Sequence, residues 1–172
     1  MINHQKFVAG RTSQFTSDSS PGAEGTAVLV DVLVAENNET NKVYIENVLG
    51  ELGLSYNTVE NGLEAVEAYK QSQPRIILMD IAMPFCDGVE ATEIIRRHEQ
   101  KTNLPPVPII ALSANAIPGL RERYLSAGMN DYLLKPYSID QIKQKLDQWI
   151  LPQSAGAEHP HGQQKADMFA SE

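Results

Sequence analysis

The sequence predicts an α/β protein in which helices cover both faces of a five-stranded parallel sheet, a doubly wound arrangement. Short apolar runs alternate five times with segments of helical spacing, and most of these runs end in polar residues. The alternation places one domain at residues 26–151. Residues 1–25 and 152–172 are polar and lack periodicity, so we expect a disordered arm and a disordered tail.

Composition excludes several classes of function. The formal net charge of -8 argues against nonspecific binding to nucleic acid or to anionic lipid. No apolar run approaches the roughly 20 residues needed to cross a bilayer. Cys86 is the single cysteine, so an internal disulfide is impossible and a reducing cytoplasm is the expected setting. We interpret Cys86 as an inert loop thiol, since neither a histidine nor a second cysteine lies near it in sequence.

The predicted strands are apolar and short, and the third follows directly after Pro74. Such uninterrupted runs are typical of strands that are buried on both faces. Residue Asp80 comes at the end of the third run, where Pro84 and Gly88 then turn the chain. The five predicted strands are residues 32–35, 55–59, 76–79, 109–112 and 132–134.

The first two predicted helices have apolar residues at helical spacing. In residues 40–52 the apolar face contains Val43 and Val48, and Gly53 ends the helix. In residues 63–71, Leu63 begins a series of apolar residues at three-residue steps.

The last three helices differ in the strength of their pattern. Residues 89–99 place Ile94 and Ile95 inward, and we expect the charged residues Arg96, Arg97 and Glu99 to point outward. Residues 118–127 are only weakly amphipathic and end at Gly128. Ser138 is expected to cap the fifth helix, which carries an apolar stripe at Ile139, Ile142, Leu146 and Trp149.

Polar side chains follow four of the strands. Glu36 and Asn37 follow the first, Asp80 the third, Ser113 the fourth and Lys135 the fifth. Because the carboxyl ends of parallel strands share one edge of the sheet, we expect these groups to form one shallow cleft. A carboxylate can attack a phosphoryl group, while magnesium, an ammonium and a hydroxyl neutralise and hold the phosphoryl oxygens. In the alternative interpretation, Lys135 only pairs with Asp80 and Ser113 only caps a helix.

Three segments give the sequence its resemblance to a known family: ILMDIAMP with the following DG, IALSANA, and AGMNDYLLKP, at residues 77–88, 110–116 and 127–136. Together they resemble the receiver domains of two-component response regulators, and their amino-acid sequences are most similar to the receivers of hybrid histidine kinases. The resemblance covers about residues 28–149. It implies a flavodoxin-like sheet with strand order 2-1-3-4-5.

The resemblance also implies a role for particular residues. Asp80 matches the phosphoacceptor, and Lys135 matches the lysine that pairs with it and with the phosphoryl group. Ser113 matches the switch hydroxyl and Tyr132 the switch aromatic residue. Ala82 matches the position whose backbone carbonyl binds magnesium.

One position departs from the family pattern. The first strand of the family ends in two acids, but here Glu36 is followed by Asn37. The expected magnesium ligands are Glu36, Asn37, Asp80 and the backbone carbonyl of Ala82. An amide oxygen brings no charge, so we predict weakened magnesium binding and slower or altered phosphorylation.

The function implied is that of a phosphorelay receiver, not an enzyme beyond its own phosphotransfer and dephosphorylation. The phosphoryl donor would be a phosphohistidine of a histidine kinase or a histidine phosphotransfer protein. The output would pass to a protein partner through the fourth helix, the fifth strand and the fifth helix. No nucleic acid or membrane partner is expected.

Three other functions compete with this one. The main alternative, favoured by Asn37, is a receiver-like interaction module that is not phosphorylated. A flavodoxin-like cofactor binder would need a glycine-containing phosphate loop after the first strand, and a phosphohydrolase would need a second catalytic acid beside Asp80. His159 and His161 could bind a metal, but a solvated tail explains them better.

Overall fold

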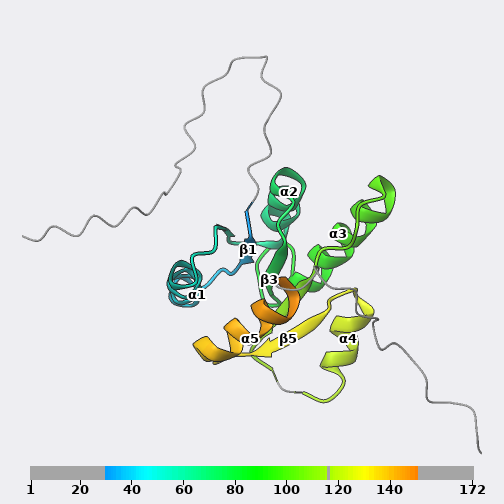
Figure 1. Ribbon diagram of the computed structural model, residues 1–172. Helices are drawn as coiled ribbons and strands as arrows, with labels where there is room; N and C mark the ends of the chain where they lie inside the picture. The colour runs from blue at the N-terminus through cyan, green and yellow to red at the C-terminus, as the bar shows by residue number, and fades with distance from the viewer. Residues whose placement is uncertain (1–29, 116, 151–172) are drawn as a thin grey trace, which may run out of the picture.

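The computed structural model describes residues 30–115 and 117–150 and shows five strands alternating with five helices (Figure 1). The expected arm (residues 1–25) and the expected tail (residues 152–172, with His159 and His161) lie outside the described residues. The strands are β1 (Val32–Ala35), β2 (Tyr56–Val59), β3 (Ile76–Asp80), β4 (Ile109–Ser113) and β5 (Asp131–Leu134). The helices are α1 (Glu39–Glu51), α2 (Gly62–Ser72), α3 (Gly88–Thr102), α4 (Leu120–Ser126) and α5 (Ile139–Ile150).

The strands form one parallel sheet in the order β2-β1-β3-β4-β5, which confirms the predicted fold. The register aligns the carboxyl ends of the central strands. Ala35 pairs with Met79, Asp80 with Leu112, and Ser113 with Leu134. The residues that follow these strands therefore start from one edge of the sheet.

Two hydrophobic layers enclose the sheet because alternate strand residues point to opposite faces. In β1, Leu33 and Ala35 pack with α2, α3 and Tyr124 of α4, whereas Val32 and Val34 pack with α1 and α5. Figure 1 shows this arrangement, with α1 and α2 lying on different sides of the sheet. Burial on both faces explains why the strands read as continuous apolar runs.

Three helix residues are more exposed than the sequence predicts. Val43, Leu63 and Ile139 were expected to face inward, but they are 44%, 53% and 43% exposed. In α1 the buried stripe consists of Ile45, Val48 and Leu49 instead. The prediction was wrong at Val43 because α1 carries apolar residues on more than one side, so spacing alone does not select the face that the sheet covers.

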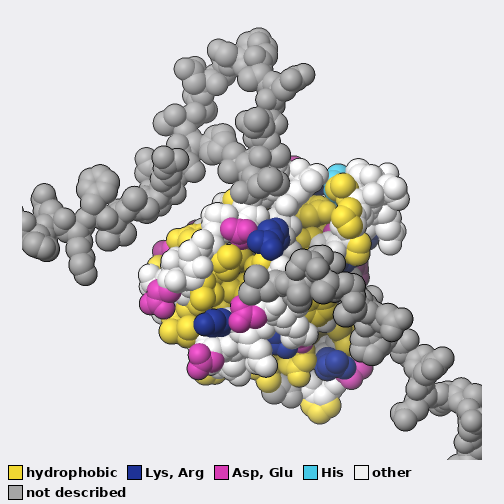
Figure 2. Space-filling view, in the orientation of Figure 1, with side chains coloured by type: hydrophobic (Ala, Val, Ile, Leu, Met, Phe, Trp, Pro, Cys, Tyr) yellow, Lys and Arg dark blue, Asp and Glu magenta, His cyan; other side chains and the backbone are white. Residues whose placement is uncertain are grey.

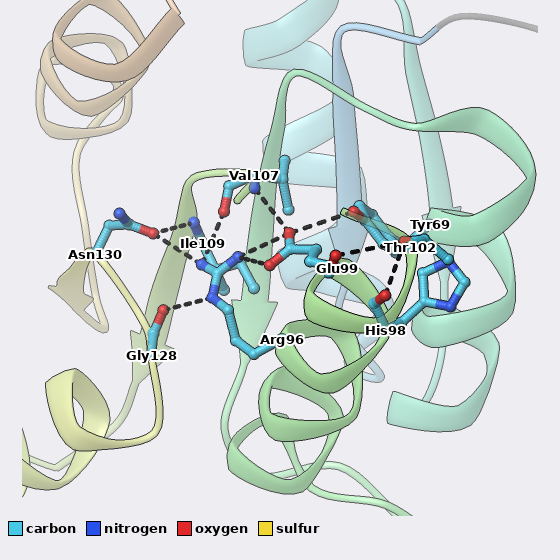
Figure 3. Close-up of polar contacts among 9 residues, drawn as sticks. All are labelled: Tyr69, Arg96, His98, Glu99, Thr102, Val107, Ile109, Gly128 and Asn130. Atoms are coloured by element: carbon cyan, nitrogen blue, oxygen red, sulfur yellow. Dashed lines mark hydrogen bonds and ion pairs between the residues drawn. The ribbon is translucent and has the colours of Figure 1, made fainter. Parts of the chain in front are cut away.

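The prediction that Arg96 and Glu99 point outward from α3 was also wrong. Glu99 is 3% exposed, and its two carboxylate oxygens accept hydrogen bonds from Nη1 of Arg96 at 2.9 and 2.8 Å (Figure 3). Glu99 Oε1 also accepts bonds from the Tyr69 hydroxyl and from the backbone N–H of Val107. A buried carboxylate is tolerated when it is paired and hydrogen-bonded in this way.

Arg96 connects α3 to the segment between α4 and β5. Its Nε donates to the carbonyl of Gly128 at 2.9 Å, and its Nη2 donates to Oδ1 of Asn130 at 3.1 Å (Figure 3). Asn130 in turn accepts from the backbone N–H of Ile109 at the start of β4. This cluster, Arg96, Glu99 and Asn130 with their backbone partners, is called the α3 polar network below.

The surface mixes charged and apolar groups. On the face shown in Figure 2, hydrophobic, acidic and basic side chains lie next to one another. The most exposed large apolar side chain in the described residues is Phe85, in the segment between β3 and α3, at 88% exposure. Among these same residues, none of the helices has the length and apolar character that a membrane span requires.

Candidate functional site

Two acidic residues are buried at the carboxyl edge of the sheet. Asp80 ends β3 and is 4% exposed, and Glu36 follows β1 and is fully buried. The backbone N–H of Glu36 donates to the carbonyl of Val59, which continues the β1–β2 pairing past the strand end and fixes the residue. Buried carboxylates need a partner to remain ionised.

That partner is Lys135, which follows β5. Its Nζ lies 2.6 Å from Oε2 of Glu36 and 2.9 Å from Oδ2 of Asp80. The Lys135 backbone N–H donates to the carbonyl of Ser113 at 2.7 Å, so the end of β4 sets where the side chain starts. The structure therefore brings together three residues that are up to 99 positions apart in the chain, as the sequence predicted.

Opposing effects act on the pKa of the Glu36 carboxyl. Burial raises the pKa of Glu36, the hydrogen bond from Lys135 lowers it, and the charge of Asp80 raises it, with a net upward shift. The pKa of Tyr137 is raised strongly by burial and by the negative charges of Glu36 and Asp80. The Tyr137 hydroxyl is buried and has no hydrogen-bond partner within the described residues.

The turn after β3 holds the Asp80 carboxylate from its other side. Oδ1 of Asp80 accepts a hydrogen bond from the backbone N–H of Ala82 at 3.2 Å. The N–H of Gly88 donates to the carbonyl of Ile81, which brings the start of α3 against the end of β3. A Cβ atom at Gly88 would lie 2.2 Å from the carbonyl oxygen of Asp80, so only glycine permits this approach.

Ser113 lies at the end of β4 and is 2% exposed. Its Oγ lies 2.9 Å from the hydroxyl oxygen of Tyr124 and 3.3 Å from the carbonyl oxygen of Asn115, to which it donates. The backbone N–H of Asn115 donates to the same Oγ at 3.2 Å. Ser113 is thus placed on the predicted edge, and within the described residues its hydroxyl bonds to Tyr124 and Asn115.

Sequence reasoning missed Tyr124 and Tyr137. Tyr124 lies in the helix with the weakest amphipathic pattern, where it stands among the charged residues Arg121, Glu122 and Arg123. A single aromatic residue in such a charged helix was the available signal for an inward-facing position. Tyr137 directly follows the Lys135-Pro136 pair, and nothing in its sequence context distinguishes it from an ordinary core aromatic residue.

The remaining predicted site residues lie around this cluster. Asn37 and Ala82 are exposed, next to buried Glu36 and Asp80. Tyr132 in β5 is half-buried and packs against the hydrophobic layer that includes Tyr124. Within residues 30–115 and 117–150, no three His, Cys, Asp or Glu side chains form a metal-binding group, so any cation here would also need neutral oxygen ligands.

The surroundings of Cys86 agree with its interpretation as an inert thiol. It is 2% exposed, and burial together with the nearby charges of Glu90 and Asp87 raises the pKa of its thiol to about 11. A thiol with this pKa carries little thiolate at neutral pH, and the thiolate is the reactive form.

Comparison with known proteins gives a consistent result. The family model described as "Response regulator receiver domain" matches residues 32–147. The sensor protein GacS of Pseudomonas syringae pv. syringae is 38% identical over 118 residues, which is 69% of this chain and 13% of that protein. The response regulator mcs4 of Schizosaccharomyces pombe is 32% identical, over 73% of this chain and 28% of that protein. The chain therefore spans a small part of these curated relatives.

Two solved structures of related chains are similar in fold. The receiver domain of the sensor histidine kinase PA1611 from Pseudomonas aeruginosa PAO1, which has a magnesium ion coordinated in its active site cleft, is 41% identical with a TM-score of 0.63. The match covers 72% of this chain and 98% of that one. The second structure contains the receiver domain of Ssk1 from Saccharomyces cerevisiae, crystallised with the histidine phosphotransfer protein Ypd1. It matches with 30% identity and a TM-score of 0.68, over 73% of this chain and 92% of that chain.

Proposed function

Because the chain belongs to the response regulator receiver domain family, we propose that it accepts a phosphoryl group on the carboxylate of Asp80. The observation that carries the proposal is the ammonium of Lys135, which lies 2.9 Å from Asp80 and 2.6 Å from Glu36. This arrangement supplies a carboxylate and a fixed positive charge at one point, as phosphoryl transfer requires.

In the proposed transfer, an oxygen of Asp80 forms a bond to phosphorus while the bond between phosphorus and a histidine nitrogen of the donor breaks. The electron pair of that broken bond stays on the imidazole nitrogen. The ammonium of Lys135 has three protons, and two can serve Glu36 and Asp80. The third is then available to an oxygen of the phosphoryl group, and the bond to Glu36 keeps the amine in place.

The donor atoms around Asp80 fit magnesium, although with little charge. Asp80 Oδ1 accepts one backbone hydrogen bond at 3.2 Å, which leaves further lone pairs for a cation. We propose Asp80, Asn37, Glu36 and the backbone carbonyl of Ala82 as the residues that would hold the ion. Bound magnesium would neutralise negative charge on the phosphoryl oxygens. Since Asn37 is neutral, we propose that binding is weaker than with an acid at that position.

The partners follow from the same chemistry. A phosphohistidine of a histidine kinase or of a histidine phosphotransfer protein would be the donor, and the Ssk1 receiver crystallised with Ypd1 supports the second source. Ser113 and Tyr132 would act as the switch hydroxyl and the switch aromatic residue. The surface of α4, β5 and α5 would pass the change to a downstream protein. A location in the cytoplasm stays a prediction, which rests on the single cysteine.

The proposal is tested by incubating the chain with acetyl phosphate at several magnesium concentrations and measuring intact mass. We expect a gain of one phosphoryl group that hydroxylamine removes and that depends on magnesium. Asp80→Asn should abolish the gain, because an amide cannot form the acyl phosphate.

Asp140→Asn is the matched control, since it makes the same chemical change at an exposed residue of α5. It should be modified as the unchanged chain is. If the unchanged chain gains no mass and its NMR spectrum shows no magnesium-dependent shift, the chain is an interaction module on the receiver fold, and our proposal is wrong.

A further inference from the structure

The hydroxyl of Ser113 already uses its full capacity for hydrogen bonds. A serine hydroxyl has one proton to donate and two lone pairs to accept with. Here Oγ has three partners: the Tyr124 hydroxyl at 2.9 Å, the Asn115 carbonyl at 3.3 Å and the Asn115 N–H at 3.2 Å. To donate its proton to a phosphoryl oxygen, Ser113 has to give up the bond that it donates to the Asn115 carbonyl, and a movement of its Oγ toward Asp80 would also disturb the contact with Tyr124.

The contact with Tyr124 is the one that burial makes costly to break. Tyr124 is 3% exposed and packs in the hydrophobic layer with α2 and α3. If Ser113 moved toward Asp80 alone, the Tyr124 hydroxyl would lose a partner in a buried place. The two hydroxyls therefore have to move together, or Tyr124 has to find water by displacing α4.

The other end of α4 is held in place. The Arg96 side chain donates to the carbonyl of Gly128, just after the helix, and belongs to the α3 polar network (Figure 3). The N–H of Met129 also donates to the carbonyl of Tyr124. At the opposite end, Gly119 has a φ of +89° and no side-chain cap bonds the helix start. A displacement of Tyr124 would thus move the start of α4 more than its end.

We propose that Tyr124 is a positioning residue that holds the Ser113 hydroxyl in its unphosphorylated position and links the release of that hydroxyl to a movement of α4. The inference rests on the proposed function, since it concerns the same site. It adds a second buried hydroxyl to the serine and aromatic residue that sequence reasoning assigned to the switch. Tyr124 opposes activation until the phosphoryl group draws Ser113 away.

The test is Tyr124→Phe, which removes the hydroxyl and keeps the ring. Loss of one hydrogen bond in the unphosphorylated state should lower the half-saturating beryllofluoride concentration about three- to tenfold at fixed magnesium. Tyr69→Phe is the matched control, because it also removes a buried tyrosine hydroxyl bond, the one to Glu99 at 3.2 Å, in the α3 polar network. The control should leave the beryllofluoride affinity unchanged. Equal or weaker affinity in Tyr124→Phe overturns the proposal.

A double-mutant cycle separates positioning from a general effect on packing. In a Ser113→Ala background the hydroxyl that Tyr124 holds is absent, so adding Tyr124→Phe should no longer change beryllofluoride affinity. If the two changes act additively, Tyr124 works through packing and the proposal is wrong. Urea unfolding of all four proteins shows whether each remains folded under the assay conditions.

A third measurement does not depend on phosphorylation. NMR relaxation dispersion on the α4 and Ser113 amides, without beryllofluoride, reports exchange between the two arrangements. Tyr124→Phe should increase the minor population relative to the unchanged chain and to Tyr69→Phe. If the unchanged chain binds no beryllofluoride, the proposed function fails, and this measurement still decides the role of Tyr124. An unchanged minor population then rejects it.

Discussion

Asn37 lies at the exposed rim of a site whose two acids, Glu36 and Asp80, are buried. Glu36 already serves Lys135 at 2.6 Å and accepts from the N–H of Asn38 at 3.0 Å. Its carboxylate is therefore engaged with protein groups, so a cation held as we propose would meet negative charge at the rim mainly from Asp80. The residue at position 37 is the most direct means of changing that charge.

Replacing Asn37 with Asp should tighten magnesium binding, because it adds a full negative charge facing the cation. A charge at contact distance is worth about 1 kcal/mol or more in a well-screened site, so the dissociation constant should fall about fivefold or more. Isothermal titration with magnesium measures the effect. Asn47→Asp, an equal change of charge on the exposed side of α1, is the control. Equal tightening in both variants would show that overall charge, not the site, is responsible.

The close approach of the backbone at Gly88 predicts an effect on stability. An alanine Cβ would lie 2.2 Å from the Asp80 carbonyl oxygen, and backbone atoms cannot yield easily, so Gly88→Ala should destabilise the fold by about 1–3 kcal/mol or more. Gly50→Ala is the matched control. Apart from its chain neighbours and the backbone of its own helix, no atom lies within 4 Å of a Cβ placed at Gly50 in α1. The substitution should therefore stabilise the fold by about 0.5–1 kcal/mol. Urea unfolding measures both, and equal effects would contradict the close approach.

At the scale of elements, α3 shows how a charged residue can belong to the core. Arg96 is 14% exposed in its side chain and neutralises Glu99, which is 3% exposed, whereas Arg97 and Glu93 form a solvent-facing pair 3.9 Å apart. The first pair also ties α3 to the segments that precede β4 and β5. The two pairs lie on one helix but differ in burial.

Removing the buried cation should therefore be far more harmful than removing the exposed one. Arg96→Met leaves Glu99 as an unpaired buried charge, so we expect a loss of about 3–5 kcal/mol in the free energy of unfolding. Arg97→Met, the matched control, should change it by less than about 1 kcal/mol. Chemical denaturation of both variants gives the comparison. A loss at Arg96 as small as at Arg97 would mean that the network contributes little.

The elements also show what sequence reasoning can reach. Strands such as residues 76–80 were predicted well, because burial on both faces leaves an uninterrupted apolar run. The convergence of Asp80 and Lys135 followed from strand ends alone. The inward turn of Arg96 and Glu99 could not be predicted, since it depends on partners such as Val107 and Asn130 that pattern rules do not place. The same holds for the bond between Tyr124 and Ser113, which joins two elements.

For the whole molecule, the amino edge of the sheet is joined by its own polar cluster. Oδ2 of Asp31 accepts bonds from the Ser55 N–H at 2.9 Å and from its hydroxyl at 2.7 Å. Oδ1 accepts from Arg75 at 3.1 Å, and Arg75 also donates to the carbonyl of Ile150. These residues precede β1, β2 and β3 and connect them to the end of α5.

This cluster should make stability depend on pH in acid. Burial works to raise the pKa of Asp31, but the Ser55 and Arg75 contacts outweigh it, so the pKa is lowered from the ordinary 3.8. The stabilisation is then fully present above pH 3.8 and is lost as pH falls through the lowered value. Urea unfolding at several pH values across this range should show that the free energy of unfolding depends less steeply on pH in Asp31→Asn than in the unchanged chain. Asp140→Asn on α5 should keep the pH dependence of the unchanged chain. If Asp31→Asn keeps it as well, Asp31 is not the group that makes stability depend on pH.

The position of this amino-edge cluster has a consequence for how such a domain can diversify. The contacts among Asp31, Ser55 and Arg75 lie at the opposite rim from Asp80, so they do not involve the side chains around Asp80. Mutations at the Asp80 rim can therefore leave the contacts at the amino edge intact. A protein engineer could vary the exposed loop positions around Asp80, while keeping Gly88 and Lys135, and expect the open sheet beneath them to stay folded.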